Sequence, residues 1–305
     1  KKKHFKTDVI NKAIFEADSF MYNEGIAAVA DICNSNLSFN IKKNSKLFYH
    51  NLIEIFGSDS SKAETTFNNA IQLYKLSSYN FPGSIVPHAP YSVSNSLFNL
   101  IKYFSESNNT PYSIHLLESE DEIDYFYNKS GKIQERIKLL NIDNHSFKPT
   151  GLSPLNSILQ FLPKNNNILF VHNTYINKED LDFASLNLPN LFFCFCPSSN
   201  LFIEEKLPDI NLFDFNKQNI CIGTDSLASN SSLSLIRELI NISTYYSEIS
   251  LHNLLKAATL NPAKYLGIDN KFGSFEKGKY PGVILLKNLN LTNLKLSDNS
   301  SVQLI

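Results

Sequence analysis

The sequence predicts an α/β protein built on a parallel (β/α) barrel, with a short strand-containing segment at its C-terminal end. Short apolar runs bounded by turn residues alternate with longer amphipathic stretches, which is typical of βαβ units and a parallel sheet. Polar side chains follow several of these runs, as they do at the carboxyl edge of barrels where catalytic residues lie. The clearest case is residues 219–230, where an apolar run breaks into Gly223 and Asp225.

Seven apolar runs are expected to form the strands of this barrel. In order they are residues 26–32, 47–56, 84–91, 111–118, 167–173 and 191–197, and the apolar run that opens residues 219–230. A closed (β/α)8 TIM barrel has eight strands, and this chain starts directly with a helical pattern. We therefore expect the first barrel strand to be missing from the 305 residues.

Amphipathic stretches between the runs are expected to form helices over residues 8–24, 61–76, 92–104, 233–243 and 251–266. Gly25 should end the first helix as a C-cap, and Ser92 or Ser94 should begin the third. Residues 119–162 form a stretch too long for an ordinary loop, so we expect part of it to be helical.

The chain is expected to have two parts. Residues 1–268 carry the alternating pattern and are assigned to the barrel. Residues 269–305 lose the helical period, and Gly273, Gly278 and Gly282 separate short strand-like pieces. We assign this tail to a separate, strand-containing segment.

The composition indicates a globular protein, with 43% hydrophobic and 19% charged residues. A net charge of −1 gives no electrostatic footprint for nucleic acid or an anionic membrane. Residues 1–6 are basic but lack the apolar core of a signal peptide, and no apolar run nears the roughly 20 residues of a membrane span. The four cysteines lie in apolar runs without zinc-like or disulfide-like spacing. These features favour a reduced, cytoplasmic protein.

Polar side chains stand at the ends of four expected strands: His88, His115 with Glu118, His172, and Asp225. Histidine is a common zinc ligand, and a nearby carboxylate outside the metal shell can move protons for a bound water. His115 and Asp225 would supply two metal ligands. His172 would supply a third or hydrogen-bond the substrate.

Each of these residues also has a plainer interpretation. A single histidine in an apolar strand is more often a hydrogen-bonded core residue, and Asp225 could be the N-cap of a following helix. Several strands ending in the same residue types are harder to explain by packing. We expect Asp31 to be structural, and residues 198–200 to line a pocket or cap a helix. The remaining histidines are expected to be structural or solvated: His4, His50, His145 and His252.

The strand-end motifs resemble those of a known superfamily. Residues 84–94, 114–119, 171–173, 196–200 and 223–226 are similar, in order, to signatures of the amidohydrolase superfamily. The similar branch holds guanine, cytosine and S-adenosylhomocysteine deaminases and the triazine chlorohydrolases. Residues 257–263 and 273–279 resemble its closing helix and its return into a small β-sandwich. The resemblance therefore implies that residues 269–305 are the C-terminal part of a composite β-sandwich.

The resemblance implies a metal-dependent hydrolase that deaminates a purine-like or other N-heterocyclic amine. It assigns His115 and Asp225 as metal ligands and Glu118 as the proton shuttle. Asp225 would also accept a proton from the water, His172 would orient water or substrate, and His88 would contact the substrate. The fourth strand-end motif carries no lysine. Branches of the superfamily that bind two metal ions have a carboxylated lysine there, which bridges the two ions. One divalent cation is therefore expected, most simply zinc, with iron as the alternative.

The sequence departs from this family at one place, because no His-x-His pair occurs where the first strand should supply two further ligands. We therefore expect the chain to be a fragment of a longer protein and to bind metal weakly alone. Removal of another leaving group such as chloride, and a non-catalytic barrel that keeps only the pocket, are the alternative functions. The expected partner is a small molecule, to which Arg136 could offer a bidentate contact. Assembly as a homodimer is left open.

Overall fold

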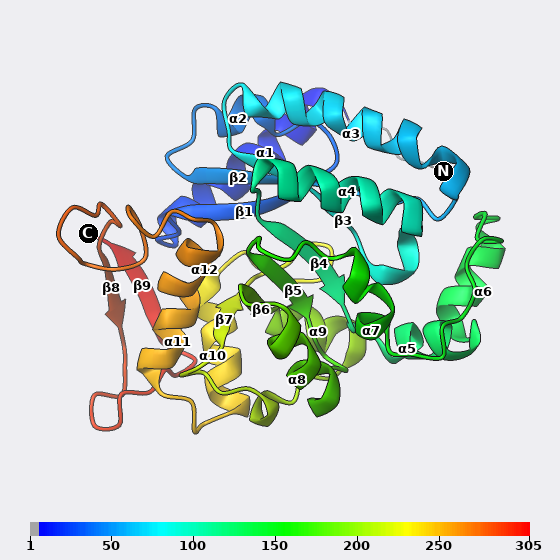
Figure 1. The fold of residues 1–305 in the computed structure, drawn as a ribbon. Coiled ribbons are helices and arrows are strands. Elements are labelled where there is room, and N and C mark those ends of the chain that lie inside the picture. Colours follow the sequence, from blue (N-terminus) through cyan, green and yellow to red (C-terminus); the bar gives the residue numbers. More distant parts are fainter. Residues whose placement is uncertain (1–5) are drawn as a thin grey trace.

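The structure, a computed structural model, describes residues 6–305, and its centre is a set of seven parallel strands (Figure 1). Three form one sheet in the order β1-β2-β3: Ala28–Cys33, Phe48–Ile55 and Gly83–Pro87. Four form a second sheet in the order β4-β5-β6-β7: Tyr112–Leu116, Ile168–His172, Leu191–Phe195 and Asn219–Ile222. All seven expected strands are present in the expected order, which confirms a parallel α/β architecture.

The two sheets meet at β3 and β4, where the N–H of His115 donates to the carbonyl oxygen of His88 over 3.0 Å. Pro87 ends β3 and has no N–H to donate, so a regular ladder cannot continue there. Within residues 6–305, β1 pairs with β2 alone and β7 with β6 alone. Closure of the barrel therefore stays a prediction.

Helices lie where the amphipathic stretches predicted them: α1 (Thr7–Asn23), α3 (Ala63–Ser78), α4 (Asn95–Asn108), α10 (Leu235–Tyr245), α11 (Leu251–Ala258) and α12 (Leu260–Tyr265). Gly25 follows α1 with φ +78°, the left-handed conformation expected of a C-cap glycine. Ser94 caps α4 by accepting the N–H of Leu97. The last expected helix is divided at Thr259, whose φ of −130° is not helical.

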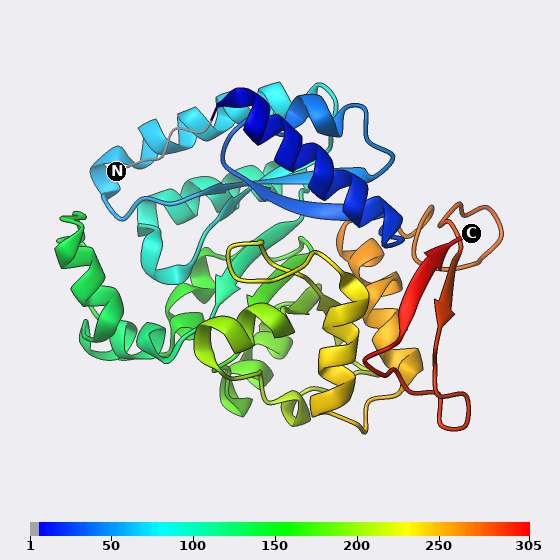
Figure 2. The ribbon, with the colours of Figure 1, turned by 180° about the vertical axis from the view of Figure 1, so that it is seen from behind.

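Further helices connect the strands: α2 (Phe39–Lys42), α5 (Glu120–Asn128), α6 (Gly131–Leu139), α7 (Pro154–Ile158), α8 (Lys178–Asn187) and α9 (Pro197–Glu204). Single 3₁₀ turns cover Ser60–Lys62, Pro90–Ser92, Leu159–Phe161 and Ile210–Leu212. The expected partial helicity of residues 119–162 is confirmed by α5, α6 and α7. Helices α5 and α6 project from the body of the molecule in both views (Figures 1 and 2).

The strands divide the core into two layers. On β6, Phe193 and Phe195 belong to the large apolar cluster that packs the strands against the helices. Phe192 and Cys194 point to the other side, where they form a smaller cluster with Cys196, Cys221 and Tyr265. All four cysteines are free and buried. They are small core residues, as the sequence predicted.

The tail contributes β8 (Ile284–Lys287) and β9 (Ser301–Leu304), which form an antiparallel pair beside the helices of the C-terminal half (Figure 2). This pair matches the strand-like pieces expected there, and its place in a β-sandwich stays a prediction. Between residues 6 and 305, no helix has both the length and the apolar character needed to cross a membrane.

Candidate active site

The candidate site lies at the carboxyl ends of the strands. His115 is in β4 and His172 is the last residue of β5, while His88, Glu118 and Asp225 follow β3, β4 and β7 within three residues. Neighbouring strands are parallel and in register, so their ends meet at the same edge of the sheets. The ring of His115 lies close to both of the other imidazoles. Its centroid is 5.2 Å from that of His88 and 5.4 Å from that of His172.

Glu118 and His172 are in direct contact, with Oε1 of Glu118 3.3 Å from Nε2 of His172. Burial raises the pKa of Glu118, and the charge of His115 lowers it in part. Burial lowers the pKa of His172, so its imidazole is neutral near pH 7. A carboxyl group with raised proton affinity therefore lies beside a neutral imidazole.

Glu122 fixes the turn that carries Glu118. Its carboxylate accepts the backbone N–H of Leu117 over 3.1 Å and that of Glu118 over 2.8 Å. Only 1% of Glu122 is exposed, and Leu117 takes a left-handed φ of 50°, which is rare for leucine. The turn is thus strained and is held by a buried acceptor, as is common at functional sites.

Asp225 is held by two hydroxyl groups. Its Oδ2 accepts hydrogen bonds from Ser199 Oγ over 2.6 Å and from Ser229 Oγ over 2.5 Å. Burial acts to raise the pKa of Asp225, but the hydrogen bonds outweigh burial and hold it below its ordinary value. The next helix begins at Leu235 with Ser234 as its N-cap, so Asp225 does not cap it. Asp225 is therefore an ionised carboxylate at a strand end.

Glu54 belongs to the same cluster and was missed by the sequence analysis. It is the next-to-last residue of β2, and its Oε1 lies 3.4 Å from Nδ1 of His115. Glu54, His88 and His115 offer ligand atoms that all lie within 4.8 Å of one another. The sequence does carry a signal for Glu54, because it is a lone carboxylate inside the apolar strand β2, and the next strand is followed by His88.

The donor set fits a divalent cation. Imidazole and carboxylate are the ligands that zinc and similar metals take in proteins. Burial raises the pKa of Glu54 and of Glu118, and the negative charge of Asp225 raises both further. A bound cation would offset this repulsion among three carboxylates. The structure groups His115 with His88 and Glu54, and it places Asp225 within electrostatic range of Glu54 and Glu118.

Arg136 is more distant from this cluster. It lies exposed on α6, and its charge acts on Tyr91, whose ring meets that of His88 edge-on at 5.9 Å. Among residues 6–305, no hydrogen bond or ion pair joins Arg136 to these imidazoles or carboxylates.

The residues expected to be structural lie elsewhere. Asp31 pairs with the buried Lys42, and Nε2 of His50 lies 2.9 Å from Ser84 Oγ. His145 and His252 are exposed, while His4 lies outside the described residues. These placements agree with the sequence analysis wherever the structure describes them.

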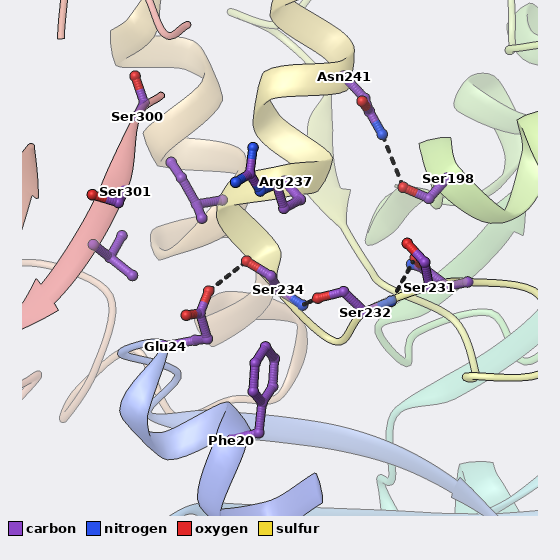
Figure 3. Close-up of a pocket in the computed structure, with 13 residues that line it drawn as sticks. Phe20, Glu24, Ser198, Ser231, Ser232, Ser234, Arg237, Asn241, Ser300 and Ser301 are labelled. Carbon is purple, nitrogen blue, oxygen red and sulfur yellow. Dashed lines mark hydrogen bonds between the residues drawn. The ribbon is translucent and has the colours of Figure 1, made fainter. Parts of the chain in front are cut away.

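A separate polar cavity of about 380 Å³ lies between α1, α10 and β9 (Figure 3). Several of its lining groups are hydrogen-bonded to one another. Ser234 Oγ donates to Glu24 over 2.5 Å, and Asn241 donates to Ser198 Oγ over 2.9 Å. None of the strand-end imidazoles or carboxylates described above lines it, so we keep this cavity apart from the candidate site.

Comparison with known proteins identifies a family model and several relatives that this chain matches. The sequence profile described as "Amidohydrolase family" matches residues 20–303. The adenosine deaminase of Helicobacter pylori is 27% identical over 278 residues, which cover 88% of this chain and 65% of that protein. The 5-methylthioadenosine/S-adenosylhomocysteine deaminase of Saccharophagus degradans is 28% identical over 212 residues, 67% of this chain and 43% of that protein.

A solved structure is similar over most of the fold. The Helicobacter pylori aminofutalosine deaminase in complex with methylthio-coformycin aligns with a TM-score of 0.78 and 26% identity. The alignment covers 89% of this chain and 67% of that one. The chain spans less than two thirds of the length of either curated relative described above.

Proposed function

The chain belongs to the amidohydrolase family, and from this premise we propose that it carries the active site of a metal-dependent deaminase acting on a purine-like substrate. The observation that carries the proposal is the 3.3 Å contact between Glu118 and His172 beside the ring of His115. It combines a group that can carry protons with two imidazoles at one strand edge. The relatives named as deaminases of adenosine and methylthioadenosine point to an amino-purine.

One divalent cation, most simply zinc, would be held by His115 and Asp225. A divalent metal in such a site lowers the pKa of a water ligand to about 7, which supplies the nucleophile at neutral pH. The hydrogen bonds to Asp225 keep its carboxylate in the ionised form that binds a cation. Ser199 and Ser229 occupy one oxygen of Asp225, which leaves Oδ1 for the metal.

The residues of the chain then supply the acid–base chemistry. Water adds to the ring carbon that carries the amino group, the carbon–nitrogen bond breaks, and ammonia leaves. Glu118 takes the proton from the attacking water and delivers it to the departing nitrogen, for which its raised pKa is suited. His172 is fixed against Glu118 and orients the water or the substrate.

Two residues are assigned to substrate binding. The ring centroid of His88 lies 5.2 Å from that of His115, and Nδ1 of His88 is 2.9 Å from Ser92 Oγ. Its Nε2 is therefore the ring nitrogen left for a hydrogen bond to the heterocycle. Arg136 lies on the projecting helix α6, where it could bind an anionic group of a larger substrate.

The test is ammonia release by the zinc-loaded chain from adenosine, 5′-methylthioadenosine and S-adenosylhomocysteine, with free nucleobases as a comparison set. We expect release from at least one aminopurine. Absence of ammonia from the whole panel, while zinc is bound, would contradict the proposed reaction class for this chain.

A further inference from the structure

The proposed reaction leaves one buried carboxylate of the site without a role. Glu54 is 9% exposed and lies opposite Val86 in the pairing of β2 with β3. Its Oε1 is buried and has no hydrogen-bond partner among residues 6–305. A buried polar atom without a hydrogen-bond partner costs folding free energy, so a neighbouring group should explain its position.

The neighbour of Glu54 is the ring of His115. The nearest ring nitrogen to Oε1 of Glu54 is Nδ1, at 3.4 Å, and the same nitrogen lies 2.9 Å from the carbonyl oxygen of His88. Two acceptors next to Nδ1 favour the tautomer in which Nδ1 carries the proton. Nε2 then keeps its lone pair and is the nitrogen that can bind a cation.

We propose that Glu54 is a positioning residue, whose carboxylate, together with the His88 carbonyl, fixes the tautomer and the orientation of His115 for metal binding. The proposal rests on the proposed function, which makes His115 a ligand. A histidine that binds metal commonly donates its other N–H to a carboxylate or a backbone carbonyl. Here both kinds of acceptor lie beside one nitrogen, the carboxylate from β2 and the carbonyl oxygen from the residue that follows β3.

Direct coordination by Glu54 is the competing interpretation, because its Oε1 and the ring nitrogens of His88 and His115 lie within 4.8 Å of one another. The hydrogen bonds oppose it. Nδ1 of His115 is engaged by the His88 carbonyl, and Glu54 approaches that nitrogen rather than Nε2. A positioning carboxylate changes the affinity for the cation but is not one of its ligands. Its removal should therefore leave the absorption bands of bound Co²⁺ in place, whereas removal of a ligand should shift them.

The experiment is a titration of the chain with Co²⁺, followed by its visible absorption and by competition with a chromophoric chelator. The variants are Glu54→Gln, which keeps the shape and one acceptor oxygen, and Glu54→Ala. Glu64→Ala is the matched control, because Glu64 is an exposed glutamate on α3. Circular dichroism establishes that each variant is folded before titration.

We expect Glu54→Ala to weaken Co²⁺ binding about 10- to 100-fold, as is typical when the partner of a metal-binding histidine is removed. Glu54→Gln should weaken it less, Glu64→Ala should match the unaltered chain, and the absorption bands should keep their positions throughout. The proposal is overturned if Co²⁺ binds the folded Glu54→Gln variant as tightly as the unaltered chain, and Glu54→Ala is either misfolded or also unchanged in affinity. The proposed metal site would then stand. Shifted bands in Glu54→Gln would overturn it in favour of direct coordination. No Co²⁺ binding by the unaltered chain would overturn both the proposal and the proposed metal site.

Discussion

Oε1 of Glu118 lies 3.3 Å from Nε2 of His172, although the two residues belong to different strand ends and are 54 positions apart in the chain. Both side chains are mostly buried, so little water competes for this contact. Burial raises the pKa of the carboxyl group and lowers that of the imidazole, which brings their proton affinities closer together. Such a pair can hold a proton and pass it between its two groups.

The first prediction concerns Glu118. Glu118→Gln keeps the size of the side chain and removes its ability to carry a proton. We expect ammonia release to fall about 10²- to 10⁴-fold, the usual contribution of a general acid–base group. The affinity for zinc, measured by titration, should stay unchanged. Loss of zinc together with activity would show that Glu118 is a ligand instead.

The second prediction concerns Asp225. Asp225→Asn keeps an acceptor for Ser199 and Ser229 but removes the negative charge. Both zinc affinity and ammonia release should fall, the latter by several orders of magnitude, while the thermal midpoint changes little. Asp298→Asn, at an exposed aspartate of the tail, is the control. Near-normal activity of Asp225→Asn would remove Asp225 from the metal site.

The third prediction concerns Glu122, which holds the turn before α5. Glu122→Leu leaves the N–H groups of Leu117 and Glu118 without their acceptor. Each unpaired buried donor should cost about 1–3 kcal/mol of the free energy of unfolding, measured in urea. Turnover should fall more than KM rises, because Glu118 loses its position and not its chemistry. Glu120→Gln, in the same helical turn and exposed, should change neither quantity.

Much of the fold could be predicted because apolar runs and helical periods are local properties of the sequence. All seven strands follow from this pattern, and so do the cap residues Gly25 and Ser94. The helix α9 was missed because it starts at Pro197 directly after β6, where the sequence reads as a polar turn. The helix α8 was missed because few of its residues are apolar, with Leu181 and Ala184 as the buried ones.

The residue types of the site could be predicted from the sequence, but only some of the contacts between them could. His88, His115 and His172 could be placed at one edge because strand ends are visible in the sequence. The role of Glu54 depends on the direction of its side chain from β2, which brings it to Nδ1 of His115 in β4 although β3 lies between the two strands. Register and side-chain direction of this kind arise from tertiary packing, so no local pattern carries them.

The fourth prediction concerns acid stability. Burial lowers the pKa of His50 to about 4, whereas the unfolded chain should titrate near the ordinary value of about 6.5. The unfolded state therefore binds the proton first. The free energy of unfolding should fall as the pH drops from about 6.5 towards 4, by up to about 3 kcal/mol from this residue.

Urea unfolding at a series of pH values measures this effect. His50→Gln should reduce the pH dependence in that range, because glutamine can still bond Ser84 Oγ without taking up a proton. His252→Gln, at an exposed histidine, should leave the dependence unchanged. Equal pH dependence of the unaltered chain and His50→Gln would contradict the assignment to His50.

The fifth prediction, the dependence of ammonia release on the divalent cation, tests the central claim most directly. The chain is freed of metal with a chelator, titrated with Zn²⁺, and assayed with the aminopurine that the screen selects. We predict that release is absent without the cation, rises with zinc occupancy to one ion per chain, and is lost in His115→Asn at every zinc concentration tested. Release that persists in the chelator, or that His115→Asn retains, would contradict a metal-dependent site at these strand ends.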